Sequence, residues 1–161
     1  PMGATLPITA KSSAPDLLVW AAQDPDSLPL QRLQVIKGWV DDSGESRELT
    51  YDVACSDGLA VDPQTHRCPD NGAGVNPTDC TPTGNAGAPQ LVSLWRDPDF
   101  DPGQRAFYYA RVLENPGCRW SSYDILAAGD SITPAYQVPR VIQERAWSSP
   151  VWLQPTGEKP Q

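Results

Sequence analysis

The fold class of this chain is decided by the stretch Arg105-Ala-Phe-Tyr-Tyr-Ala-Arg-Val-Leu-Glu-Asn-Pro-Gly-Cys-Arg-Trp120. From residue 105 to residue 113 the side chains alternate between two faces, as they do along a β-strand. Phe107, Tyr109 and Leu113 share one face, and small or apolar residues share the other. Because both faces are partly apolar, we expect this strand to be central in a sheet.

A hairpin is predicted upstream of this strand. Residues 32–40 alternate, and the turn signal Asp41-Asp-Ser-Gly44 follows them. Leu49, Tyr51 and Val53 then alternate with polar residues, which predicts the returning strand. Short apolar runs predict further strands, and these are a buried strand at residues 17–22, a strand at 91–95 and a last strand or pair of strands at 141–153.

Proline and glycine residues mark where the remaining predicted elements are interrupted or end. Pro150 interrupts the last strand region, which places that element at an edge or at a bulge. Ser121-Ser-Tyr-Asp124 has the form of a capping box and Gly129 follows at helix-ending distance, so residues 122–128 are predicted as one short helix. The sequence therefore predicts a mainly β fold, a β-sandwich of about six or seven strands.

Composition limits the partners of the domain. The formal net charge is −8, which argues against nucleic acid and against an anionic membrane surface as partners. No apolar run approaches the roughly 20 residues that span a bilayer, so no membrane span is expected.

Four cysteines, Cys55, Cys68, Cys80 and Cys118, indicate disulfides. Their spacing is not that of metal ligands, and the chain has only one histidine, His66, that could join them in a metal site. Three pairings are possible, and buried free thiols in a cytosolic protein are the alternative. We favour Cys55–Cys68 with Cys80–Cys118, which would staple the long Pro- and Gly-rich loop at residues 55–90. Disulfides imply an oxidising compartment, periplasmic or extracellular.

Two tryptophans are the candidate binding residues. Trp120 and Trp147 each lie close to an arginine, Arg119 and Arg145, in turn-like sequence. The rings could stack with these guanidinium groups at the surface or at a domain interface. Three further tryptophans lie in strand patterns and are expected in the core: Trp39, Trp95 and Trp152.

No catalytic constellation is recognisable in the sequence. Asp97, Asp99 and Asp101 alternate as in a calcium loop, but Pro102 and Tyr108 stand where an EF-hand requires Gly and Glu. We interpret this segment as a rigid turn with solvated carboxylates. His66 is interpreted as a surface residue, and no metal or other cofactor is expected in this chain.

Several long blocks of the sequence resemble the C-terminal part of the bacterial domain-of-unknown-function 3604 family (DUF3604). The similarity runs from the first residue to about residue 153. The blocks include Arg32-Leu-Gln-Val-Ile-Lys-Gly-Trp39, Trp95-Arg-Asp-Pro-Asp-Phe-Asp-Pro102, Gln104-Arg-Ala-Phe-Tyr-Tyr-Ala-Arg-Val-Leu-Glu114 and Ile142-Gln-Glu-Arg-Ala-Trp-Ser-Ser-Pro-Val-Trp152.

This resemblance implies an exported protein whose larger N-terminal part is similar to the PHP superfamily of metal-dependent phosphoesterases, with its divalent metal upstream of this chain. Residues 1–14 would continue as an extended segment from that catalytic part, 15–153 would form the C-terminal β-domain, and 154–161 a flexible tail. The implied role is a non-catalytic domain that packs on the catalytic part and lines its cleft. The alternative is an autonomous carbohydrate- or peptide-binding module that uses Trp120 and Trp147.

Overall fold

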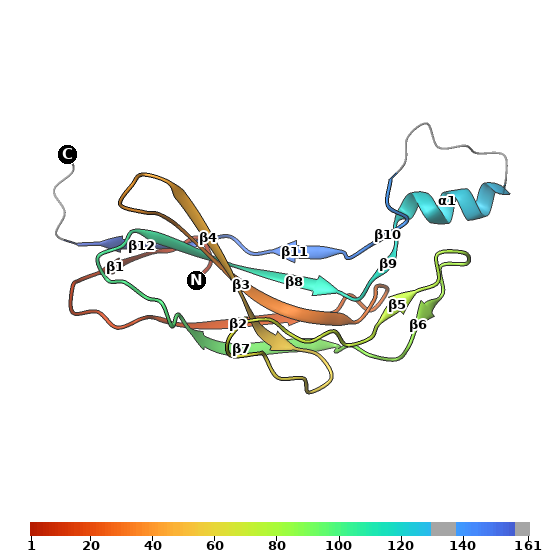
Figure 1. The fold of residues 1–161 in the computed structure, drawn as a ribbon, viewed down its shortest axis with the longest axis horizontal. Coiled ribbons are helices and arrows are strands. Elements are labelled where there is room, and N and C mark those ends of the chain that lie inside the picture. Colours follow the sequence, from red (N-terminus) through yellow and green to blue (C-terminus); the bar gives the residue numbers. More distant parts are fainter. Residues whose placement is uncertain (130–137, 157–161) are drawn as a thin grey trace.

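The computed structural model describes residues 1–129 and 138–156 (Figure 1). The main strands are β1 (Thr5–Ile8), β2 (Asp16–Ala22), β3 (Leu30–Val40), β4 (Ser46–Cys55), β7 (Gln90–Arg96), β8 (Ala106–Glu114), β11 (Arg145–Trp147) and β12 (Val151–Pro155). Four two-residue strands, β5 (Gly74–Val75), β6 (Pro82–Thr83), β9 (Gly117–Cys118) and β10 (Val141–Ile142), and one helix, α1 (Trp120–Ala128), complete the described elements.

A six-stranded sheet faces a two-stranded one. The larger sheet has the order β1-β12-β8-β3-β4, with β11 also paired to β8, and the smaller consists of β2 and β7. The core lies between them, where Val35, Tyr108 and Leu153 of the large sheet pack against Val19 and Trp95 of the small one. The predicted mainly β fold with one short helix is confirmed.

Strand β8 is central, as predicted. It pairs with β3 on one side and with β11 and β12 on the other. Pro150 lies in the break between β11 and β12 and so takes no place in a ladder. Of the two predicted alternatives, an edge or a bulge, the edge does not hold for β12, because β1 pairs with it in parallel from Thr5 to Ile8. Residues 1–14 therefore contribute a strand to the large sheet.

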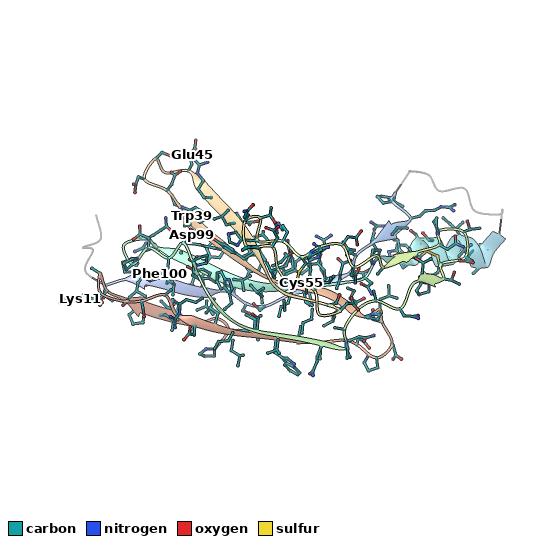
Figure 2. All side chains as sticks on the ribbon, turned by 60° about the horizontal axis from the view of Figure 1, so that its bottom comes forward. Lys11, Trp39, Glu45, Cys55, Asp99 and Phe100 are labelled. Carbon is teal, nitrogen blue, oxygen red and sulfur yellow. A yellow bond between two sulfur atoms is a disulfide. The ribbon has the colours of Figure 1, made fainter. Side chains whose placement is uncertain are left out.

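The hairpin of β3 and β4 is confirmed. Its ladder runs from Val40 paired with Ser46 to Arg32 paired with Cys55, with a bulge at Leu33/Gln34. Its turn, which carries Glu45, extends beyond the rest of the sheet (Figure 2). Asp41 organises this turn by accepting hydrogen bonds from Ser43, Glu45 and Arg47.

Three local predictions need correction. Strand β2 forms, but it is not buried, because every second side chain along it is exposed. Helix α1 begins at Trp120 rather than at residue 122, and its N-cap, Arg119, makes no side-chain capping hydrogen bond, so the predicted capping box is absent. Trp152 was expected in the core and is 45% exposed.

Both predicted disulfides are present, Cys55–Cys68 and Cys80–Cys118. They hold a loop with little regular structure, and the second joins this loop to β9. In the part of the chain that the structure describes, no helix is long and apolar enough to cross a membrane. Strand β12 continues to Pro155, and the rest of the predicted tail, residues 157–161, lies outside the described residues.

Candidate functional site

An ion pair lies in the interior between the sheets. Lys37 Nζ is 2.7 Å from the Asp97 carboxylate, and both side chains are almost fully buried. Lys37 also donates to the main-chain carbonyl of Asp99 at 2.7 Å, and Asp97 accepts a hydrogen bond from the Tyr108 hydroxyl at 2.6 Å. The prediction that the carboxylates of this turn are solvated is therefore wrong for Asp97.

Two tyrosines complete this interior cluster. Tyr51 donates its hydroxyl hydrogen to Asp99 at 2.7 Å. Burial, and then the hydrogen bond to a carboxylate, raises the pKa of Tyr51 and of Tyr108 well above the ordinary value. Both tyrosines therefore remain protonated donors at neutral pH. Within the described residues, no buried side-chain nitrogen or oxygen lacks a hydrogen-bond partner, so the cluster is satisfied internally and acts as a tie between the sheets.

The sequence contained one signal for this cluster. Lys37 alternates with Leu33, Val35 and Trp39 on the apolar face of its strand. A cation in that register must find a buried partner, because an unpaired charge in the interior is costly. The partner lies 60 residues further on, in a segment that reads as a polar turn, so its identity could not be deduced locally.

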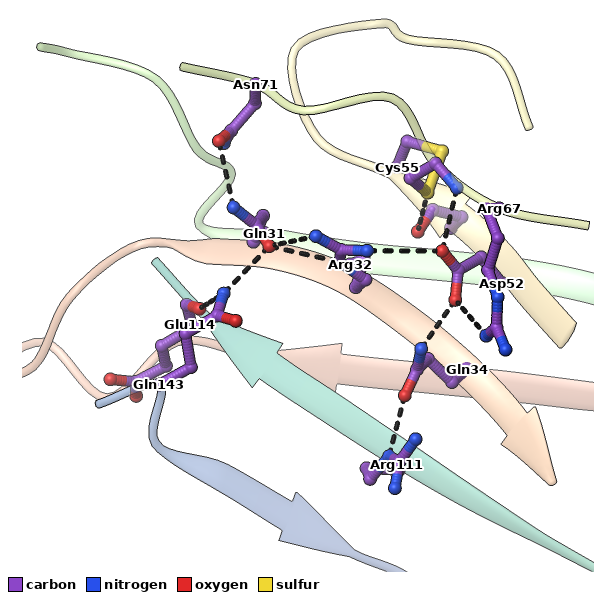
Figure 3. A network of polar contacts seen from close by, with 12 residues as sticks. Gln31, Arg32, Gln34, Asp52, Cys55, Arg67, Asn71, Arg111, Glu114 and Gln143 are labelled. Atoms are coloured by element: carbon purple, nitrogen blue, oxygen red, sulfur yellow. Dashed lines mark hydrogen bonds and ion pairs between the residues drawn. A yellow bond between two sulfur atoms is a disulfide. The ribbon is translucent and has the colours of Figure 1, made fainter. Parts of the chain in front are cut away.

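A second polar network holds the cysteine-rich loop against the hairpin (Figure 3). Its centre is the buried carboxylate of Asp52, which accepts hydrogen bonds from the Gln34 side chain and from the main-chain nitrogen of Cys68. Arg32 and Arg67 approach the same carboxylate at 3.5 and 3.6 Å. The network therefore supports the Cys55–Cys68 disulfide from the sheet side.

A second set of hydrogen bonds, centred on Asp57, fixes the cysteine-rich loop near its C-terminal end. Asp57 accepts hydrogen bonds from the Ser56 hydroxyl and from the main-chain nitrogen of Gly87, and these lower the pKa of Asp57. Gly87 has φ +120°, and a Cβ there would lie 2.4 Å from Cβ of Pro29. Only glycine fits this close approach of loop and strand.

His66 lies in this loop and is half-buried rather than fully exposed. Its ring contacts the Tyr51 ring edge-on, with the centroids 5.1 Å apart. Across residues 1–129 and 138–156, no group of three or more His, Cys, Asp or Glu side chains is placed to hold a metal ion.

The predicted binding residues are at the surface but do not form one site. Trp120 is 69% exposed at the start of α1, and Trp147 is 58% exposed in β11. Helix α1 lies beyond the end of the large sheet, whereas β11 lies along β8 (Figure 1). Arg119 donates its Nε to the carbonyl of Pro139 at 3.1 Å, and Arg145 is exposed beside Trp147 on the same strand.

An exposed apolar face, which the sequence analysis did not predict, covers the outside of the small sheet. Its four residues, Leu18, Trp20, Val92 and Leu94, are 58–73% exposed. They form two cross-strand pairs, Leu18 with Leu94 and Trp20 with Val92. We call these four residues the β2–β7 apolar face. The exposed ion pair of Asp16 and Arg96 borders it.

The fold and these surfaces define a disulfide-bonded β-sandwich domain with an exposed apolar face. The chain belongs to the family described as "Protein of unknown function (DUF3604)", whose model matches residues 1–155. No curated protein and no solved structure shows significant similarity to it. The family resemblance is thus confirmed, while the relation to PHP-type enzymes stays a prediction.

Proposed function

We propose that this chain is a non-catalytic β-domain of a larger exported metal-dependent hydrolase of the PHP type, and that it packs on the catalytic part through the β2–β7 apolar face. The observation that carries the proposal is the exposure of Leu18, Trp20, Val92 and Leu94 on one face of the small sheet. Contiguous exposed apolar side chains bounded by polar ones are typical of an interface. Burying such a side chain contributes roughly 1.5–3 kcal/mol.

Charge favours a different surface over a second copy of this chain as the occupant of that face. Each copy has a formal net charge of −8, so two copies repel each other at long range. The catalytic part would also hold the divalent metal of the enzyme. Trp120 and Trp147, which project at two other places, would lie at the margin of its cleft or in solvent.

Separate expression of the two parts tests this proposal. The isolated chain should bind the upstream part, measured by calorimetry, and Leu18→Ser with Leu94→Ser should weaken that binding by at least about a hundredfold, since two buried contacts of roughly 1.5 kcal/mol each are lost. The matched control is Val40→Ser with Leu49→Ser, two exposed apolar residues of the hairpin. Binding that survives the first pair of substitutions, or that the control pair abolishes equally, would contradict docking through this face.

A further inference from the structure

We propose that the outer face of the large sheet carries a saccharide-binding groove centred on Gly38. This Gly38 groove has a volume of about 360 Å³ and is lined by residues of β3, β4, β8 and β12, together with Arg105. It lies on the face opposite the core, because side chains alternate along β8 and its core residues are Ala106 and Tyr108. The proposal does not depend on docking through the β2–β7 apolar face.

One row of residues across four strands builds the groove. Trp152 pairs with Phe107, Phe107 with Gly38, and Gly38 with Glu48, so all four face the same side. The rings of Trp152 and Phe107 are in contact, with centroids 5.1 Å apart. Trp152 remains 45% exposed and so presents an aromatic surface to solvent.

Gly38 lets the ring of Phe107 lie close to the main chain of β3, between Trp152 and the carboxylate of Glu48. A Cβ at this position would lie 2.2 Å from Cζ of Phe107. The phenyl ring therefore covers the main chain of Gly38, which any other residue would prevent. This packing sets the ring of Phe107 low against the sheet, where it forms part of the floor of the groove.

The rim of the groove supplies hydrogen-bonding groups. Glu48 lies two strands away from Phe107, a separation of about 10 Å at the ordinary strand spacing. The side chains of Glu48 and Arg105 are both exposed, and neither side chain has a hydrogen-bond or ion-pair partner among residues 1–129 and 138–156. Arg47, in contrast, is engaged by Asp41 and Glu45.

This arrangement matches the chemistry of a sugar ring. A pyranose presents C–H groups on its flat face, which pack on an aromatic ring, and hydroxyl groups at its edge, which bond to a carboxylate and a guanidinium. An extended peptide fits less well. Three of the four strands that line the groove, β3, β8 and β12, are paired on both sides. A peptide strand could therefore pair only with the outer edge of β4, two strands away from Phe107.

Calorimetric titration of the isolated chain with cellohexaose, xylohexaose and a galacturonic acid hexamer tests the proposal. At least one of these probes should bind, and Trp152→Ala and Glu48→Gln should each weaken its binding by about tenfold or more, equivalent to about 1.4 kcal/mol. The control is Tyr123→Ala, an exposed aromatic residue of α1 that lies outside the groove and outside the β2–β7 apolar face.

Two outcomes would overturn the assignment. One is the absence of heat with all three probes at millimolar concentration, and the other is an equal loss of binding in the Tyr123→Ala control. Near-ultraviolet circular dichroism monitors folding of each variant. If Trp152→Ala is not folded, the Glu48→Gln variant decides, because its exposed carboxylate makes no packing contribution.

Discussion

Lys37 and Asp97 show how this chain holds its two sheets together. The pair joins β3 of the large sheet to the end of β7 in the small one, and Tyr108 and Tyr51 extend the contact to β8 and β4. Removing two charges from water costs free energy that their attraction only partly offsets. We expect the pair to contribute registry, because the observed placement of the sheets satisfies Lys37, Asp97 and Tyr108 together.

Lys37→Met should destabilise the fold by roughly 3–5 kcal/mol, because it leaves the Asp97 carboxylate buried without a cation. Urea denaturation at pH 7 measures the free energy of unfolding. Adding Asp97→Asn to the same variant removes the buried charge and should restore part of the loss, while Tyr108 keeps an acceptor. If the free energy of unfolding of the Lys37→Met variant lies within about 1 kcal/mol of the wild-type value, the proposed role of the pair is refuted.

Stability should fall at alkaline pH because of Tyr51 and Tyr108. Both tyrosines have a pKa in the folded state above the unfolded value of 10.0, so the unfolded chain loses their protons first. The stabilisation is therefore complete below pH 10 and is lost as pH rises above it, by at most about 1.4 kcal/mol per pH unit for each tyrosine. Tyr108→Phe should flatten this dependence in denaturation curves between pH 8 and 11.5. An unchanged slope would show that Tyr108 is not the group responsible.

Individual elements were predictable where alternation and turn signals agreed. The hairpin at residues 32–53 and the central strand β8 are both confirmed. The prediction of a buried strand at residues 17–22 was wrong because the strand is apolar on both faces. Only the fold determines that the face with Leu18 and Trp20 is exposed. The prediction that Trp152 lies in the core was wrong for the same reason, since alternation shows which residues share a face and not which face is buried. The interior cluster needs contacts far apart in sequence, which local patterns do not encode.

The cysteine-rich loop should depend more on Cys80–Cys118 than on Cys55–Cys68. The Cys80–Cys118 bond closes a loop of 38 residues, and the Cys55–Cys68 bond closes one of 13. In the chain-entropy treatment the longer loop corresponds to about 4 kcal/mol of stabilisation and the shorter loop to about 3 kcal/mol. The Asp52 network also holds the shorter loop by non-covalent contacts. Replacing each pair by serine and measuring thermal unfolding checks the order. A larger loss for the Cys55/Cys68 variant would contradict it.

At the scale of the whole molecule, the two layers are unequal. Two strands cover a sheet of six, so the small sheet is buried on its inner side only and its outer side faces solvent. Natural domains avoid apolar residues on such a face unless another surface covers them. The formal net charge of −8 opposes self-association through this face, because two copies repel each other at long range.

The isolated chain should bind a hydrophobic dye, anilinonaphthalene sulfonate, although it is folded. Leu18→Thr with Leu94→Thr should reduce the dye fluorescence while the free energy of unfolding changes by no more than about 0.5 kcal/mol per site, because both side chains are already in solvent. Threonine also suits a strand. The comparison variant Leu33→Thr, at a fully buried position, should lose roughly 2–5 kcal/mol. A large loss of stability in the double variant would mean that this face is packed within the domain itself, and docking through it would then be ruled out.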